Sequence, residues 1–434
     1  MLNKHPALHL LLKNKELFIA LYFLLFILGL TIGISSKFYN EFRVLEVILL
    51  LGLAFYSLIY KQCYVSRLEI LFLTYIAVAS LFWQHYEFIV LDLLLAYLLY
   101  KCFFILEYNE QLTRLIVIAS LLIFPLLPIS VIDYINTGAY YPIWHPMPWN
   151  IRIYDSYLLI VSIWAVWFYS TQIKYRNIYL IFLLLAFFTI LLNASRSVTL
   201  AYTVFIVIIV TYNRTVRWQL LSTYVASWFT YLSISYLASI HMVNASVSGL
   251  QIARVTTSLR YDLWMNALEC WLQSPFVGCG FYQFGRYEHL AAHPHNLLLQ
   301  ILTETGLIGF GFLLAIFVTI LKNIPWQIKK SYFVLASLLA IGIDTSLSGT
   351  HIYPITQIAI LWLMVFLLKN PAFEHATYFN RILPCRSRLN RFTAIAIYCI
   401  LLSIFGYVFI TTTVLLDNNI PETPPRFWEY GYKI

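Results

Sequence analysis

The segment His293-Pro294-His295-Asn296 comes directly before LLLQILTETGLIGFGFLL, residues 297–314. Asn296 is a favourable N-cap, and Pro294 disfavours a helical residue before it, so a helix is expected to begin at residue 297. The apolar character continues to residue 321, which is long enough to cross a bilayer. His295 then lies just above the positive end of the helix dipole, which attracts anions and keeps a nearby imidazole neutral. The segment therefore predicts a membrane helix with a polar site at its mouth.

The rest of the chain has the composition of a membrane protein. Hydrophobic residues make up 61% of the 434 residues and charged residues only 11%, whereas about 25% of a soluble domain is charged. Alternating barrel strands are absent, so the sequence predicts an all-α, polytopic bundle of about 12–13 transmembrane helices. The spans are expected at 17–34, 44–60, 68–83, 88–106, 115–132, 154–171, 178–193, 198–212, 218–239, 297–321, 331–346, 355–369 and 392–416.

Lysine and arginine in the short loops orient these spans. Most of the 28 basic residues fall on one side if the N-terminus is cytoplasmic, so the net charge of +9 reflects contact with anionic lipid and not nucleic-acid binding. Residues 240–296 then form one large periplasmic loop and 417–434 a short periplasmic tail, within a single integral-membrane domain, 1–434. Trp428 and Tyr430 are expected to attach the tail to the surface.

The large loop also contains a helical register at residues 259–271, which predicts a helix lying across the bundle mouth. Of the six cysteines, Cys270 and Cys279 fall in the oxidising compartment. They could form a disulfide or remain two buried thiols, and the sequence leaves both possibilities open. No CxxC or HExxH pattern is present, and no metal or other cofactor is expected.

Arginines on the periplasmic side need a separate explanation, because topology disfavours them there. Arg152, at the mouth of the sixth span, could face a ligand or reach lipid phosphate. Arg196 lies in the turn 193–197, which is either a hairpin capped by Ser195 or Asn193 or, with its amides, an anion site. Guanidinium donates two parallel hydrogen bonds to phosphate. The predicted diphosphate-binding residues are Arg152, Arg196, Arg254, Arg260 and Arg286.

Further polar groups are expected to support the site. Asn296 caps the helix, and Glu304 would lie about 12 Å deeper on a straight helix, as a structural or supporting group. Asp344 and His351 belong to the segment after the eleventh span and could reach the same mouth. Asp92 lies near the start of the fourth span, and its role is open between a functional residue and a solvated helix end.

Histidine is the natural base near neutral pH. Histidines and arginines at a membrane surface suit a lipid diphosphate that carries a sugar, because the arginines would neutralise the charge on the leaving diphosphate. His295 would take the proton of an acceptor hydroxyl as it attacks the anomeric carbon, while His293 would support it or contact the acceptor. An unperturbed imidazole titrates near pH 6.5, so activity is expected to fall below about pH 6.

With these residues, the chain resembles the O-antigen ligase and Wzy polymerase superfamily, which includes bacterial O-oligosaccharyltransferases. The resemblance implies a GT-C-like helical fold in a Gram-negative inner membrane, with a periplasmic active site that transfers a glycan from undecaprenyl diphosphate. It also implies that His295 is catalytic and that Arg196 and the 254–260 region bind phosphate. The matching residues are His293-Pro294-His295-Asn296 with Leu299, Glu304 and Gly306, the pattern from Arg260 to Gly280, and Ser195-Arg196.

The acceptor divides this superfamily. Asn150-Ile151-Arg152, Ile352-Tyr353-Pro354 and PPRFW at 424–428 resemble patterns of the protein-glycosylating branch, whose acceptor would be a Ser or Thr of a pilin-like protein. A ligase acting on lipid A–core and a chain-extending polymerase are the alternatives within the superfamily. A lipid-linked glycan transporter is the alternative from another class. The expected partners are the lipid-linked donor, one of these acceptors and membrane lipids.

Overall fold

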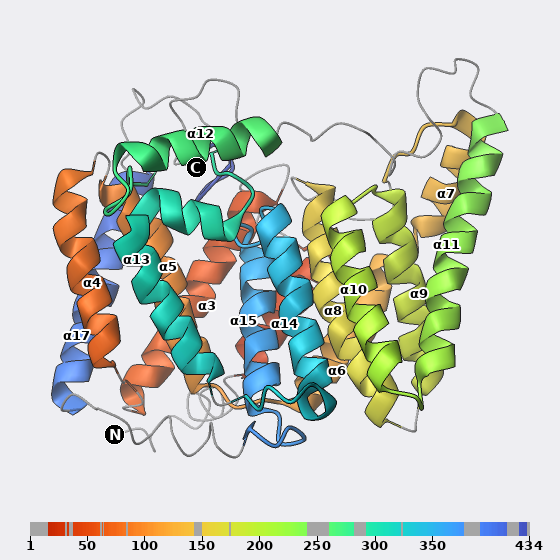
Figure 1. Cartoon of the computed structure of the whole chain (residues 1–434), viewed down its shortest axis with the longest axis horizontal. Helices are drawn as coiled ribbons and strands as arrows, with labels where there is room; N and C mark the ends of the chain where they lie inside the picture. The colour runs from red at the N-terminus through yellow and green to blue at the C-terminus, as the bar shows by residue number, and fades with distance from the viewer. Residues whose placement is uncertain are drawn as a thin grey trace.

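The computed structural model describes residues 16–30, 33, 38–60, 63, 65–83, 86–142, 150–172, 175–240, 260–281, 292–322, 324–376, 391–414 and 425–431. These residues form helices and no strand, apart from one isolated bridge between Trp428 and Gly431. Successive spans run in opposite directions, while α12 lies across one end of the bundle, called here the α12 end (Figure 1).

The helices are α2 (Glu16–Ile27), α3 (Tyr39–Ile59), α4 (Arg67–Ala79), α5 (Tyr86–Ile105), α6 (Glu110–Ala119), α7 (Leu127–Thr137), α8 (Ile151–Thr171), α9 (Arg176–Leu192), α10 (Arg196–Tyr212), α11 (Arg217–Ile240), α12 (Arg260–Gln273), α13 (Leu297–Leu321), α14 (Ile328–Leu347), α15 (Pro354–Lys369) and α17 (Arg391–Val408), with the short helices η2 (Ser80–Phe82), η3 (Ser120–Ile123) and η6 (Phe409–Val414).

Apolar helices run throughout the described part of the chain. Each of the thirteen predicted spans coincides with a helix or a helical pair, which confirms the all-α, multi-pass membrane fold. Shorter apolar helices are Glu16–Ile27, Arg176–Leu192, Arg196–Tyr212 and Pro354–Lys369. The helical segments long and apolar enough to cross a membrane are Tyr39–Ile59, Glu110–Thr137, Ile151–Thr171, Leu297–Leu321, Ile328–Leu347 and Phe392–Thr413.

The fifth predicted span is divided into α6, η3 and α7. Pro125 follows η3 and has no backbone N–H for a continuous helix. Pro128 then occupies the first turn of α7, where a missing N–H costs little. The two prolines therefore explain why one apolar run of the sequence forms two helices in series.

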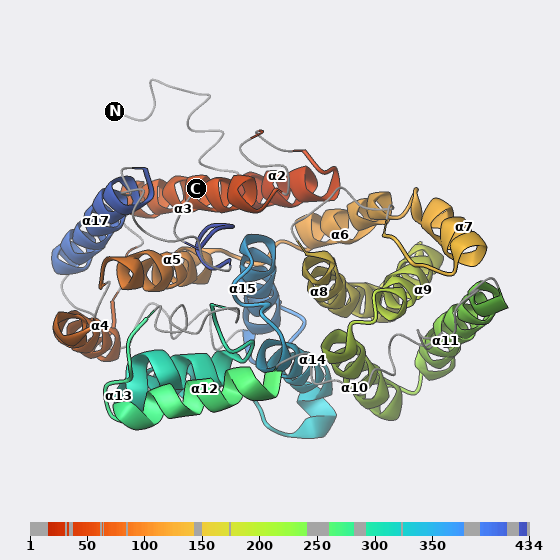
Figure 2. The ribbon, with the colours of Figure 1, turned by 90° about the horizontal axis from the view of Figure 1, so that it is seen from above.

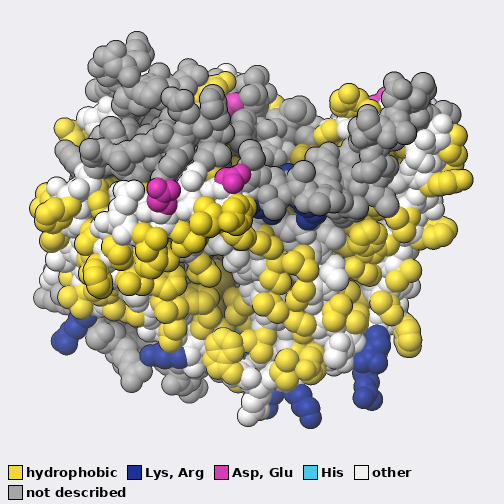
Figure 3. Space-filling view, turned by 45° about the horizontal axis from the view of Figure 1, so that its top comes forward, with side chains coloured by type: hydrophobic (Ala, Val, Ile, Leu, Met, Phe, Trp, Pro, Cys, Tyr) yellow, Lys and Arg dark blue, Asp and Glu magenta, His cyan; other side chains and the backbone are white. Residues whose placement is uncertain are grey.

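The end of the bundle opposite α12 carries exposed basic side chains, among them Arg67, Arg214 and Lys330, which lie in connections between helices or at their starts. Figure 3 shows Lys and Arg side chains along this lower rim, below a wide apolar belt. This is the arrangement that the positive-inside pattern predicts.

The middle of the bundle is occupied by α8 and α15, with α2 and α3 along one edge and α12 and α13 along the other (Figure 2). Both central helices are buried over most of their length, with the indoles of Trp164 and Trp362 fully buried. Because these helices are apolar on all sides, they suit a position enclosed by other helices. They form a rigid core whose α12 ends hold Arg152 and the connection before α15.

Helix α13 is broken at Gly306, which has φ 63° and ψ −174°. Only glycine adopts this conformation readily. The N–H groups of Leu307 and Ile308 donate to the carbonyls of Pro275 and Phe276, at 2.9 and 3.2 Å, and not to the preceding turn of α13. The first part of α13 lies beneath α12, and the second part crosses the bundle (Figure 1). Glu304 therefore stays near the mouth, and the predicted depth of about 12 Å on a straight helix is wrong.

Helix α12 covers the first part of α13, as the sequence register predicted. The Thr303 hydroxyl donates to the Ala267 carbonyl at 3.3 Å, and the Trp264 indole donates to the Pro294 carbonyl at 3.0 Å. Cys270 and Cys279 are joined by a disulfide, which settles the alternatives that the sequence left open. The disulfide ties α12 to the glycine-containing turn that accepts the broken helix.

The described part of the C-terminal tail, residues 425–431, returns into the bundle between α3, α5 and α15 (Figure 2). The Trp428 side chain is fully buried, and the Glu429 N–H donates to the Asn40 side chain of α3 at 2.8 Å. The predicted surface attachment is therefore wrong for Trp428, whereas Tyr430 remains exposed. Because the chain here must satisfy its backbone groups in an apolar interior, it uses side chains of α3 as partners.

Gly306→Ala is expected to destabilise the protein strongly. The new Cβ would collide with the Phe276 carbonyl, and the backbone conformation alone would cost about 1–3 kcal/mol. Thermal unfolding in detergent should show a midpoint several degrees lower. Gly311→Ala is the matched control, because it lies in the same helix with open space around it. A Gly306→Ala protein as stable as the Gly311→Ala protein would contradict this account of the break.

Candidate active site

Asn296 begins α13 as predicted, because its side-chain oxygen accepts a hydrogen bond from the Leu299 N–H at 3.0 Å. The preceding residue, His295, has φ 52°, a left-handed conformation that residues other than glycine rarely adopt. Its N–H donates to Nδ1 of His293 at 3.2 Å, so a neutral His293 carries its proton on Nε2. This local fold brings the two imidazole centroids within 4.2 Å of each other.

A third imidazole joins this pair from the connection between α14 and α15. The ring centroid of His351 lies 5.9 Å from that of His293. Gly349, in the same connection, packs directly on the pair: a Cβ at this position would lie 2.7 Å from Cε1 of His293 and 3.1 Å from Nδ1 of His295. The connection and the histidine motif therefore form one close-packed unit, and the absence of a side chain at Gly349 makes room for it.

Asp344, near the end of α14, fixes the conformation of this connection through hydrogen bonds. Its two carboxylate oxygens accept from the hydroxyls of Ser348 and Thr350, at 3.0 and 2.7 Å, and Thr350 also pairs with Ser156 of α8 at 2.9 Å. Asp344 is fully buried, so it does not reach the open mouth. It supports the site by fixing the residues that carry His351, which refines the prediction that it reaches the mouth itself.

His351 is oriented by Gln300 of α13, with 2.8 Å between Nε2 and Oε1. Because that amide oxygen can only accept, Nε2 is the donor and Nδ1 keeps a lone pair. This Nδ1 atom is buried and has no hydrogen-bond partner among the described residues. The second ring nitrogen of His351 is therefore an available acceptor inside the site.

Glu304 has a buried cationic partner that the sequence interpretation missed. Arg426, from the C-terminal tail, contacts Oε1 of Glu304 at 2.5 Å and Oδ2 of Asp92 in α5 at 2.8 Å. Glu304 also accepts from Gln300 at 3.4 Å, so it connects Arg426 with the residue that orients His351. Asp92 thus belongs to the site and is not merely a solvated helix end. The signal was present in the sequence, since Arg426 is a further arginine on the side where topology disfavours basic residues.

Three of the five predicted phosphate-binding arginines form one cluster beside His295. Arg260 begins α12, Arg196 begins α10 and Arg152 lies in the first turn of α8. Arg260 interacts electrostatically with Arg152 and Arg196, and both Arg260 and Arg152 act on His295. Like charges gather in this way where an anion is to be bound. The remaining two predicted arginines, Arg254 and Arg286, lie outside the described residues.

The turn before Arg196 has a different structure from the predicted cap. Ser195 is the N-cap of α10 but its side chain makes no capping hydrogen bond. Asn193 donates to the buried carboxylate of Asp155 in α8 at 2.6 Å, and Ala194 adopts a left-handed conformation with φ 54°. The turn is therefore fixed to α8 through Asp155, a residue that sequence reasoning missed, and Arg196 is presented from a rigid support.

Burial and neighbouring charges keep the histidines neutral. Burial, Arg260 and Arg152 lower the pKa of His295 to about 4. Burial, His295 and Arg426 lower the pKa of His351 to about 3, and the pKa of His293 is held well below its usual range, mainly by burial. His295 is thus in the proton-accepting form throughout the neutral range. The acid limit of about pH 6, inferred from an unperturbed imidazole, is too high for this environment.

A cavity of about 340 Å³ opens beside His351, between α5, α13 and α15. Its polar end includes His351, Gln300 and Arg426, and its wall is largely apolar. Such a space fits a molecule with both a polar and an apolar part. Within the described residues, no group of three His, Cys, Asp or Glu side chains is placed to hold a metal ion.

The ionisation of His295 can be tested with diethyl pyrocarbonate, which acylates only the neutral imidazole. Because the pKa is lowered, the reactive form should persist as the pH falls to about 5, whereas an unperturbed histidine would lose reactivity near pH 6.5. Arg260→Met should move the loss of reactivity to higher pH, since one repelling cation is removed. Peptide mass spectrometry gives the modified fraction, and loss of labelling near pH 6.5 in the wild type would contradict the assignment.

The comparison with known families agrees with this geometry. A search of curated proteins finds no match for the chain. Residues 180–314 match the family model described as O-antigen ligase, a range that includes Arg196, α12, the histidine motif and Glu304. This match supports the O-antigen ligase and Wzy polymerase superfamily as the family of the chain.

Proposed function

We propose that this protein transfers a glycan from undecaprenyl diphosphate to a Ser or Thr hydroxyl of a pilin-like protein, at the periplasmic face of a Gram-negative inner membrane. The observation that carries the proposal is a cluster of Arg152, Arg196 and Arg260, of which Arg152 and Arg260 act directly on His295, a half-buried and neutral imidazole. An O-antigen ligase domain in a multi-pass membrane protein supports glycan transfer from a lipid-linked donor in general. The cavity beside His351 supports an amphiphilic substrate.

The proposed reaction places the donor diphosphate against the three arginines and the acceptor hydroxyl against His295. The hydroxyl oxygen forms a bond to the anomeric carbon while the bond from that carbon to the diphosphate oxygen breaks. The hydroxyl proton passes to His295, and the lipid diphosphate leaves with its negative charge held by the guanidinium groups. His293 would hold the neighbouring backbone and contact the acceptor, while His351 offers a second acceptor nitrogen. We expect the chemistry to need no metal ion.

A protein acceptor is supported by two segments that the sequence associated with the protein-glycosylating branch. Tyr353 forms a side-chain hydrogen bond with Asn150 and lies within the electrostatic reach of Arg152. The segments 150–152 and 352–354 therefore pack against each other next to Arg152, with Ile352 and Tyr353 buried. Transfer to lipid A–core is the second candidate, because the matching family model is described as an O-antigen ligase.

Deletion of the protein in its host, followed by mass spectrometry of pilin and lipopolysaccharide, tests the proposed acceptor. Pilin should lose its glycan while lipopolysaccharide keeps its pattern. Complementation with the wild type should restore the glycan, and His295→Ala should not, because no base remains at that position. Membrane levels and binding of the lipid donor should persist in the variant. Loss of glycan from lipopolysaccharide alone would favour the ligase alternative, and wild-type transfer by His295→Ala would refute the mechanism.

Arg196→Lys should lower transfer about 10-fold or more, because a single ammonium cannot reproduce the paired hydrogen bonds of guanidinium to diphosphate. Initial rates with a purified lipid-linked donor would measure the effect. Arg114→Lys is the matched control, since Arg114 is an exposed arginine paired with Glu110 in α6, remote from the α12 end. Equal rates for the two variants would show that Arg196 serves as an anchor and not as a ligand for diphosphate.

A further inference from the structure

Arg426 lies outside the matched region 180–314, yet its guanidinium is inside the candidate active site. The side chain is 2% exposed and comes from a segment after the last described membrane helix. It bridges Asp92 of α5 and Glu304 of α13, and Nη1 also donates to the Ala292 carbonyl at 3.4 Å. Ala292 directly precedes His293. One cation thus contacts two helices and the backbone of the histidine motif.

From Arg426 a continuous chain of contacts reaches the imidazole of His351. Oε1 of Glu304 contacts the guanidinium, and its Oε2 accepts a hydrogen bond from the Gln300 amide. The Gln300 oxygen in turn accepts a hydrogen bond from Nε2 of His351. A carboxylate held by a cation keeps a defined position, so the amide that it orients is fixed as well. The position of the His351 ring therefore depends on a residue of the C-terminal tail.

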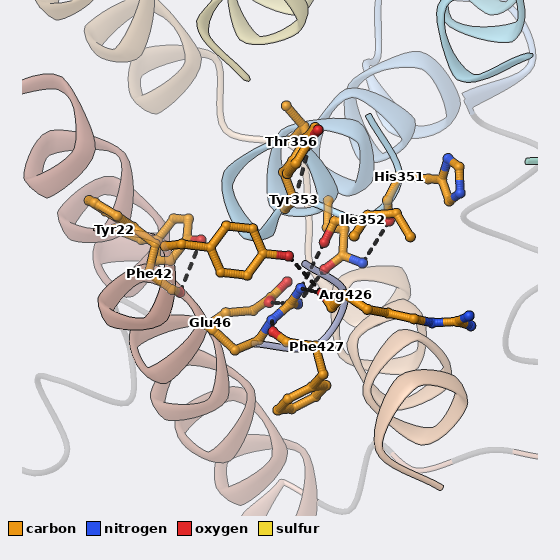
Figure 4. A network of polar contacts seen from close by, with 12 residues as sticks. Tyr22, Phe42, Glu46, His351, Ile352, Tyr353, Thr356, Arg426 and Phe427 are labelled. Atoms are coloured by element: carbon orange, nitrogen blue, oxygen red, sulfur yellow. Dashed lines mark hydrogen bonds and ion pairs between the residues drawn. The ribbon is translucent and has the colours of Figure 1, made fainter. Parts of the chain in front are cut away.

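The backbone of the tail is held in place by Arg43 of α3. Arg43 donates to the carbonyls of Phe427 and Ile352, at 2.9 and 2.7 Å, and so ties the tail to the connection that carries His351. Tyr39 adds a hydrogen bond of 2.6 Å to the Arg426 carbonyl. Figure 4 shows the Arg426 guanidinium and the His351 imidazole on the same side of this network, away from Glu46.

A purely packing role would not need these charges. Buried ion pairs add little stability over apolar residues of similar size, because the desolvation of the charges offsets their attraction. Two carboxylates next to three histidines would, without a cation, also favour proton uptake by the imidazoles. Among the described residues, the charged and titratable groups on the elements packed around His351 are His293 and His295, Glu304 of α13, Asp92 of α5, Tyr39, Arg43 and Glu46 of α3, Arg152 of α8, Arg260 of α12, Asp344 of α14, Tyr353 and Arg426.

We propose that Arg426 is a positioning residue of the transfer reaction: it anchors Glu304 and Asp92 and thereby fixes Gln300, His351 and the backbone before His293. This inference rests on the proposed function for its kinetic part. The proposed role of Arg426 is exerted through the histidines, although its side chain also lines the cavity beside His351. The C-terminal tail is thus a component of the active site.

The test compares Arg426→Met, Arg426→Lys and a charge-neutral triple variant, Asp92→Asn/Glu304→Gln/Arg426→Met, in the full-length protein. The triple variant leaves no buried charge unpaired in this cluster, so it should accumulate in the membrane even if Arg426→Met does not. Both proteins that lack Arg426 should transfer glycan about 10²-fold more slowly per molecule, the scale expected for misplaced catalytic groups. The KM for the donor should stay unchanged, and Arg426→Lys should recover part of the rate. A triple variant with the wild-type rate would overturn the proposal.

A second measurement does not require transfer. In Arg426→Met, the His351 imidazole, followed by NMR of histidine-labelled protein, should titrate at a higher pH than in the wild type, because a repelling cation is gone and two carboxylates are unopposed. The titration of His295, which responds to Arg260 and Arg152, should change less. Arg114→Met at the opposite end is the control and should change neither. An unchanged His351 profile in Arg426→Met would overturn the proposal. If the profile shifts in Arg426→Met but the wild-type protein shows no transfer activity, only the proposed reaction is rejected.

Discussion

The break of α13 at Gly306 is the constraint on which the site depends. If α13 crossed the bundle as one straight helix, Glu304 would lie deeper in the membrane interior, where an unpaired carboxylate is costly. The break turns the first part of α13 beneath α12 and keeps the motif, Gln300 and Glu304 at one level. The backbone N–H groups freed by the break donate to the carbonyls of Pro275 and Phe276. The Cys270–Cys279 disulfide ties this segment to α12.

The mouth of the bundle is divided by charge. Arginines of α8 and α12 act on His295, whereas Arg426, paired with Asp92 and Glu304, acts on His293 and His351. This division suits a reaction in which charge builds up on one fragment only. The leaving diphosphate would meet cations, while the imidazoles stay neutral and able to accept a proton.

Much of this arrangement could be predicted from sequence, because it depends on local patterns. Apolar runs predicted the spans, and Asn296 predicted the start of α13. The register at 259–271 predicted α12. Local patterns could not give the depth of Glu304, since they did not show that Gly306 adopts a left-handed conformation; that depends on the turn at Phe276, 30 residues earlier in the chain.

The pairing of the buried charges could not be predicted from sequence either, because the partners are remote from each other in the chain. Arg426 and Asp92 are separated by 334 residues, and Arg43 meets Ile352 across 309. Arg43 and Arg426 do, however, stand where topology disfavours arginine, and the reasoning that singled out Arg152 and Arg196 applies equally to them. Arg254 and Arg286 lie outside the described residues, so their part in phosphate binding remains a prediction.

The position of Arg426 after α17 also orders the assembly of the protein. The ribosome makes this residue after every described membrane helix, so the spans are inserted before their two carboxylates can meet the guanidinium. A chain that stops before residue 426 would still contain the histidine motif and the arginines of α8, α10 and α12. It would nevertheless lack the cation that fixes the histidines. On the role proposed for Arg426, the active site is complete only after translation has passed the last described span.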